Sequence, residues 1–150
     1  MFRLIPLLIL PLGLYNLFAL GGSIANRNEV QDGHNKIQAL LSDKLSFTVK
    51  MFSGDPWQFS FSDFLLLFGI AMLFIEVVKA TRTTSKEIIN HGLSMLLFVV
   101  ALIEFITLKG FATSTFFFLM LFTLFDVVAG YTISIVAAEH DLGLGKAGTD

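Results

Sequence analysis

Four long apolar blocks constrain what this chain can fold into. They cover residues 4–20, 64–78, 92–108 and 111–138 of the 150-residue sequence. About 20 residues of α-helix, with a rise of 1.5 Å per residue, cross a hydrocarbon core of roughly 30 Å. Charged residues make up only 15% of the chain, whereas a soluble domain usually has about 25%. We therefore predict an all-α fold, a single integral membrane bundle of four transmembrane helices.

Capping signals extend the shorter blocks into full spans. Asp55 followed by Pro56 has the pattern of an N-cap and a proline in the first helical turn, so we expect the second helix to begin near Pro56. Ser60 and Ser62 are alternative starts. The predicted spans are residues 4–22, 57–80, 86–109 and 112–138.

The third and fourth helices are predicted to form a tight antiparallel hairpin. Thr84, with Glu87 three residues later, is a capping box that begins the third helix. Gly110 can adopt the left-handed conformation that follows a helix end. Thr113 or Ser114 can then cap the fourth helix.

The first block contains two prolines, Pro6 and Pro11, and we expect a kink near Pro11. Arg3 ahead of an apolar run would also suit a secretory signal peptide. We favour a membrane span, because a neighbouring helix can satisfy the carbonyl groups that prolines leave free.

A long extramembrane segment, residues 23–56, separates the first two helices. Within it Ile37, Leu40, Leu41 and Leu45 recur at helical spacing among polar residues. This pattern predicts an amphipathic helix that lies in the membrane interface or against a partner. A cap over the protein's own bundle explains the pattern equally well.

The distribution of basic residues favours cytoplasmic termini. Lys79, Arg82 and Lys86 crowd the short loop after the second helix, and cytoplasmic loops carry an excess of positive charge. We expect an integral protein of a bacterial inner membrane with both termini inside. The Gly-rich tail, residues 141–150, is expected to be mobile.

Three acidic residues, Glu76, Glu104 and Asp126, lie within the apolar blocks. Each falls on a helix face of small or polar residues, which lets helices approach closely, so we expect the acids to point into the bundle. From the helical rise, Glu76 and Asp126 both lie about 20 Å below the outer ends of their helices, with Glu104 well above them. The inward-facing stripes are Ser62, Gly69 and Glu76; Asn90, Ser94, Ala101 and Glu104; and Thr123, Asp126, Gly130, Ser134 and Ala138. The side chains expected to face lipid or a partner are Phe116, Phe117, Phe118, Phe122 and Phe125.

These acids have two interpretations. They are structural locks if Glu76 pairs with Lys79 and Asp126 bonds to hydroxyl groups. Glu104 would then pair with Lys109 or with a partner's cation. Alternatively, Glu76 and Asp126 share a proton or cation in a relay with Glu104 as its outer member, since acids inside membrane spans are often functional.

Composition excludes several classes of function. The chain has no cysteine, which excludes disulfides, Cys-ligated zinc and iron–sulfur clusters. A formal net charge of −2 provides no basic field for nucleic acid. His91 and His140 are predicted on the same side of the membrane, where they could in principle ligate a haem or a metal with Glu139 or Asp141. We expect solvated histidines at the membrane interface instead. We predict no catalytic residue, no cofactor and no metal site.

The expected function is that of a small non-enzymatic accessory or scaffolding subunit in the lipid bilayer. Such a subunit would dock to other membrane subunits, or to copies of itself, through the long loop and the Phe-rich helix faces. The alternative is a proton- or cation-translocating unit that uses Glu76, Asp126 and Glu104.

Overall fold

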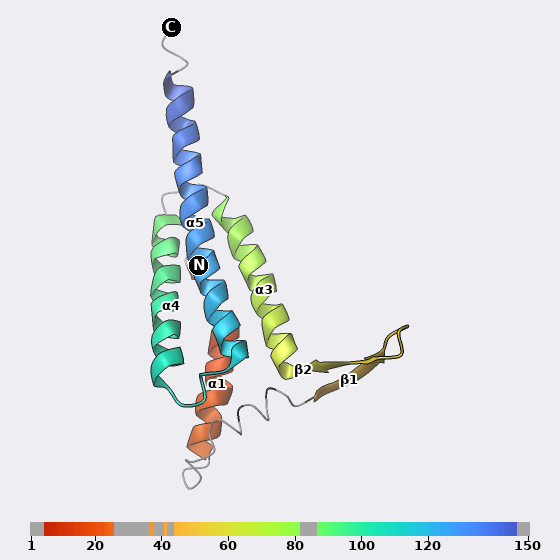
Figure 1. Ribbon diagram of the computed structural model, residues 1–150. Coiled ribbons are helices and arrows are strands. Elements are labelled where there is room, and N and C mark those ends of the chain that lie inside the picture. The colour runs from red at the N-terminus through yellow and green to blue at the C-terminus, as the bar shows by residue number, and fades with distance from the viewer. Residues whose placement is uncertain (1–4, 26–36, 38–40, 42–43, 82–86, 147–150) are drawn as a thin grey trace.

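A computed structural model describes residues 5–25, 37, 41, 44–81 and 87–146 of the chain (Figure 1). Within these residues, four helices form a bundle, and two strands form a hairpin that projects from it. The elements, in chain order, are α1 (Ile9–Ala25), β1 (Lys44–Lys50), β2 (Pro56–Ser60), α3 (Phe61–Ala80), α4 (Glu87–Thr107) and α5 (Ser114–Lys146).

The longest helix, α5, lies at the centre of the bundle. In Figure 1, α3 and α4 lie on either side of its N-terminal part, and its C-terminal part extends beyond both. α1 contacts α3 and α5 and reaches past the turn between α4 and α5. α5 continues to Lys146, so residues 141–146 of the expected tail are helical, and residues 147–150 lie outside the described part.

In the part of the chain that the structure describes, three helices are long and apolar enough to cross a membrane. They are α3 over its whole length, Ile89–Thr107 of α4 and Ser114–Glu139 of α5. The apolar part of α1, Ile9–Gly21, is shorter, and about 20 residues are needed to cross the hydrocarbon core. These three helices of the described part of the chain indicate a helical membrane protein, and the fourth predicted span, at α1, stays a prediction.

The start of α1 is shaped by two prolines. The helix begins at Ile9 rather than at residue 4, and the Pro6 carbonyl accepts a hydrogen bond from the Ile9 N–H at 3.2 Å. Pro11 therefore lies in the first turn, where a backbone N–H has no partner within the helix anyway. Pro11 removes no internal hydrogen bond from α1, so the reason for expecting a kink there does not apply.

α3 begins at Phe61 with Ser60 as its N-cap, and not near Pro56 as predicted. The Ser60 hydroxyl accepts a hydrogen bond from the Asp63 N–H at 3.2 Å, and the Asp63 carboxylate accepts one from the Ser60 N–H at 2.8 Å. This reciprocal capping box satisfies two backbone donors, more than the Asp55–Pro56 pattern offers. Pro56 instead begins β2.

The β1–β2 hairpin is absent from the sequence prediction. Its strands are antiparallel, with Val49 opposite Trp57, and the turn is closed by a hydrogen bond from the Met51 N–H to the Asp55 carbonyl at 2.9 Å. Leu45, assigned to an amphipathic helix, lies in β1. β-Branched and aromatic residues favour strands, and here they outweigh the helical spacing of a few leucines.

Two residues of the predicted amphipathic segment are buried against the bundle. Ile37 and Leu41 are each 7% exposed and belong to the hydrophobic core. With Tyr15 and Phe18 they line a small apolar pocket between α1 and α3. Their placement supports the cap over the bundle. Leu40 lies outside the described residues.

Small residues bring α3 and α4 close to α5. A Cβ atom added to Gly69 of α3 would lie 2.8 Å from the Leu119 side chain. One added to Gly130 of α5 would overlap the His91 ring of α4. Both glycines belong to the stripes predicted to face inward, and both are buried there.

Two phenylalanines predicted to face lipid lie in the core instead. Phe116 is fully buried, and its ring centroid lies 4.8 Å from that of Tyr15 on α1. Phe122 is buried between α5 and Gly69 of α3. The prediction is wrong for these two because α5 has neighbours on more than one side. It is right for the exposed residues Phe117, Phe118 and Phe125.

The turn between α4 and α5 is tied to α1. Gly110 has a φ of +89°, the positive value predicted for it. The Thr113 hydroxyl caps α5 by accepting a hydrogen bond from the Phe116 N–H at 3.2 Å. The Tyr15 hydroxyl donates to the Gly110 carbonyl at 3.0 Å. Thr84, the predicted N-cap of α4, lies outside the described residues.

Replacing Gly110 by valine should destabilise the protein, because a β-branched residue is strained at positive φ. We expect Gly110→Val to lower the free energy of unfolding in detergent by about 1–3 kcal/mol. Gly92→Val is the matched control, since Gly92 is helical and a Cβ there meets nothing within 4 Å. Equal thermal midpoints for the two variants would show that the turn does not need a left-handed residue.

Candidate functional site

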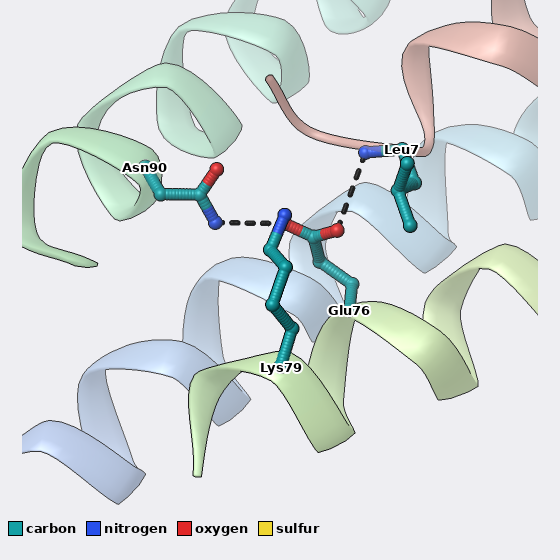
Figure 2. A network of polar contacts seen from close by, with 4 residues as sticks. All are labelled: Leu7, Glu76, Lys79 and Asn90. Carbon is teal, nitrogen blue, oxygen red and sulfur yellow. Dashed lines mark hydrogen bonds and ion pairs between the residues drawn. The ribbon is translucent and has the colours of Figure 1, made fainter. Parts of the chain in front are cut away.

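Glu76 on α3 is buried and hydrogen-bonded through both carboxylate oxygens (Figure 2). Its Oε1 atom accepts a hydrogen bond from Asn90 Nδ2 at 2.7 Å and pairs with Lys79 Nζ at 2.8 Å. Its Oε2 atom accepts a hydrogen bond from the Leu7 backbone N–H at 3.3 Å. The side chain is only 1% exposed, so protein groups take the place of its hydration.

The donors around Glu76 come from three different elements. Leu7 precedes α1, where backbone N–H groups lack helical partners and the helix dipole is positive. Asn90 lies in the first turn of α4, and Lys79 follows Glu76 by one turn of α3. One carboxylate on α3 therefore joins the start of α1 to the start of α4.

The ion pair between Glu76 and Lys79 fixes the positions of the two side chains but adds little net stability. Burying two charges carries a desolvation cost that their attraction only partly offsets. Removing one partner is much worse, because the other charge then stays buried without a counter-charge. The sequence prediction named both residues, and the structure places them in contact.

Asp126 on α5 faces the same cluster but is incompletely bonded. It is 3% exposed, and its carboxyl group interacts with the Ser94 hydroxyl of α4. The charges of Glu76 and Lys79 lie within electrostatic range of it. Among the described residues, neither Asp126 Oδ2 nor Ser94 Oγ has a hydrogen bond of good geometry. The structure thus brings the two acids together and satisfies only Glu76.

Glu104 lies apart from this cluster, near the C-terminal end of α4. Its Oε2 atom accepts a hydrogen bond from Asn16 Nδ2 of α1 at 3.1 Å. Lys109, the partner considered from sequence, is exposed and makes no ion pair with Glu104. Glu104 therefore fastens α1 to α4, at a level different from that of the Glu76 cluster.

His91 is a buried residue, and the expectation of a solvated histidine is wrong. It is 2% exposed, and its Nε2 atom lies 3.1 Å from the Ser134 hydroxyl of α5. The absence of a side chain at Gly130 leaves room for the ring. The side chain of His140 lies outside the part described. No group of three His, Cys, Asp or Glu residues that could hold a metal occurs in the described part of the chain.

Three residues of these clusters lacked a sequence signal strong enough to reveal their roles. Asn90 lies on the predicted inward stripe of α4, but the stripe alone does not pair it with Glu76. Leu7 contributes a backbone N–H, and the residue type at a position does not indicate what its backbone N–H binds. Asn16 is a single polar residue within the first apolar block, which is a weak signal for a specific contact.

Comparisons with known proteins give no functional guide. No protein-family model matches the chain, and neither a curated protein nor a solved structure matches it. Any functional assignment therefore depends on the geometry of the site and the surface.

Removing the Glu76 carboxylate should leave three donors without an acceptor. We expect Glu76→Leu to lower the free energy of unfolding by about 3–5 kcal/mol, measured by denaturant titration in mixed micelles. The Glu76→Leu/Lys79→Met double variant should lose less than the sum of the two single changes.

The control for this cycle is Glu104→Gln, because a glutamine oxygen can still accept the Asn16 hydrogen bond. It should change stability by less than about 1 kcal/mol. Strictly additive effects of the Glu76 and Lys79 changes on the free energy of unfolding would contradict a structural role for this ion pair.

Proposed function

We propose that the protein is a small non-enzymatic membrane subunit that docks to a larger membrane complex through the β1–β2 hairpin. The observation that carries this proposal is the exposed apolar surface of the hairpin. Val49 is 40% exposed, Trp57 is 48% exposed, and Phe52 at the turn is fully exposed. Figure 1 shows the hairpin projecting sideways from the start of α3, away from the helices.

A hairpin of this kind needs further packing to be stable. An isolated two-stranded hairpin is marginally stable in water at best. Within the described residues, β1 pairs with β2 in a two-stranded antiparallel sheet. A protein partner can cover the exposed apolar side chains of this hairpin.

The hairpin is joined to the bundle without a linker. Ser60 ends β2 and is also the N-cap of α3, held by its hydrogen bonds with Asp63. The direction of the hairpin therefore follows the direction of α3. Such a fixed arm on a membrane anchor suits an accessory or scaffolding role.

We also propose that α1 completes a four-helix membrane bundle, with both termini cytoplasmic, in a bacterial inner membrane. The Leu7 N–H bonds to Glu76 near one end of the bundle, and Tyr15 bonds to Gly110 at the other. Both contacts place α1 alongside the three long apolar helices. The cluster of Lys79, Arg82 and Lys86 supports the orientation.

A second candidate function, proton or cation translocation, is favoured by one observation. Asp126 Oδ2 is buried without a hydrogen-bond partner among the described residues. In proteoliposomes, a proton or sodium flux that Asp126→Asn abolishes would support translocation. Stable protein with no flux before or after the change would leave docking as the function.

Charge placed on the apolar face of the hairpin should disrupt docking. We expect Val49→Lys and Trp57→Lys to release a partner subunit of fixed stoichiometry, because a buried lysine without a counter-charge is costly. Native mass spectrometry of the complex extracted from its own membrane in mild detergent measures this directly.

Gln58→Lys is the matched control, since Gln58 is exposed and pairs with Thr48 on the opposite face of the hairpin. It should leave the complex intact. A wild-type protein that is only a monomer or a homo-oligomer would overturn the accessory-subunit proposal, and so would hairpin variants that retain their partner.

Introduced cysteines test the orientation without background, because the chain has no cysteine of its own. Thr83→Cys should react with a membrane-impermeant thiol reagent only from the cytoplasmic side. Lys44→Cys should react only from the other side. The reverse labelling pattern would contradict cytoplasmic termini.

A further inference from the structure

Glu104 is a half-buried carboxylate in an apolar part of the bundle. It lies within Ile89–Thr107, the part of α4 that is long and apolar enough to cross a membrane. Its Oε2 atom accepts a hydrogen bond from Asn16 Nδ2 of α1 at 3.1 Å. Its Oε1 atom has no hydrogen bond within the described residues and is not among the buried atoms, so it reaches the surface of the bundle. One oxygen of this carboxylate is therefore held, and the other is open to a partner.

The described residues provide no positive charge for Glu104. Among them Glu104 forms no ion pair, and the last turn of α4 contains no basic residue. That turn is also the negative end of the helix dipole, which disfavours a carboxylate. Asn16 has no second N–H to offer, because the other one donates to the Leu12 carbonyl at 3.2 Å. A charge in a membrane span is costly without a partner, so a cation beside Glu104 would be stabilising.

The surface around this carboxylate is apolar and open to another helix. Val100, one turn before Glu104, and Leu108, one turn after it, are 43% and 39% exposed. Gly13, one turn before Asn16, is exposed on α1, and a Cβ atom added to it would meet nothing within 4 Å. Glycine weakens a helix relative to alanine, and no contact within the described residues requires it here. A glycine on a membrane helix lets a second helix approach closely.

These features select the chemistry of the partner. A carboxylate oxygen without a counter-charge is complementary to an ammonium or guanidinium group, which forms strong charge-assisted hydrogen bonds with it. The apolar neighbours and the open space at Gly13 are complementary to an apolar helix. The charge thus sets the group that binds, and the surroundings set the kind of segment that carries it.

We propose that Glu104 is a docking site for a lysine or arginine side chain on the transmembrane helix of a partner subunit, which packs against α1 and α4 at Gly13. This proposal rests on the proposed subunit function and adds the chemistry of the partner. Asn16 is a positioning residue, because its amide holds one oxygen of Glu104 and leaves the other for the partner.

Transmembrane peptides of defined sequence test this site in phosphatidylcholine bilayers, whose headgroups contain no N–H donor. The probe is a polyleucine peptide with one lysine near one end, and the reference peptide has glutamine at the same position. Förster transfer between dyes on the peptide and on the full-length protein measures their association. The lysine peptide should bind the wild type about 5- to 30-fold more tightly than the glutamine peptide, the range that polar contacts between membrane helices provide.

Three variants assign this preference to Glu104. Glu104→Gln keeps the acceptor for Asn16, so its thermal midpoint in detergent should be unchanged while the preference for lysine disappears. Gly13→Leu should weaken the binding of both peptides, because the new side chain fills the open space without a clash inside the protein. Asp55→Asn removes an exposed acid from the hairpin turn and is the charge-matched control, which should keep the preference.

Equal affinity of the wild type for the two peptides would overturn the proposal, and so would a lysine preference that persists in Glu104→Gln. The first comparison needs only the wild-type protein, so it remains decisive even if a variant fails to fold. Val49→Lys should keep the lysine preference, because Val49 belongs to the hairpin. A wild type that prefers the lysine peptide but has no partner subunit in its own membrane would contradict the subunit function and still support the site at Glu104.

Discussion

The hydrogen-bonded carboxylate of Glu76 is the interaction on which the arrangement of the helices depends. A helix that starts inside a bundle brings backbone N–H groups into surroundings without water, where each unpaired group costs several kcal/mol. Glu76 accepts the Leu7 N–H at this point and also binds Asn90 of α4. α1 can begin among the other helices because a negative charge from α3 is present at its start. The same charge would be unfavourable without Lys79 beside it.

Close packing around α5 brings this carboxylate to the second acid. Gly69 and Gly130 let α3 and α4 approach α5 at distances that a side chain would prevent. Asp126 of α5 then lies near Glu76 of α3, with polar side chains of α4 between the helices. The interior is therefore polar at the level of these two acids. Many large apolar side chains are exposed on the outside of the bundle, as on a lipid-facing surface. The result is a helical bundle with a hairpin that projects from the start of α3.

The inward faces of the helices could be predicted because the signal repeats along each helix. Gly69 and Asp126 lie on the buried sides that helical spacing assigned to them. The hairpin could not be predicted by the same reasoning, since its strands are short and Leu45 also fits a helical pattern. The start of α3 depended on a choice between two possible caps. Ser60 is the N-cap, because it forms a reciprocal pair of hydrogen bonds with Asp63. The contact of the Leu7 N–H with Glu76 is long-range and involves the backbone, so the sequence contains no sign of it.

Solid-state nuclear magnetic resonance of the labelled protein in lipid bilayers tests the central claim most directly. The account predicts strong dipolar coupling between the Glu76 carboxyl carbon and the Leu7 amide nitrogen, which a hydrogen bond holds at about 4 Å. The Asn90 side-chain nitrogen should show coupling of similar strength to the same carbon. Coupling to neither nitrogen, with separations beyond about 6 Å, would contradict the account, because α1 would then start without the acceptor that its position requires.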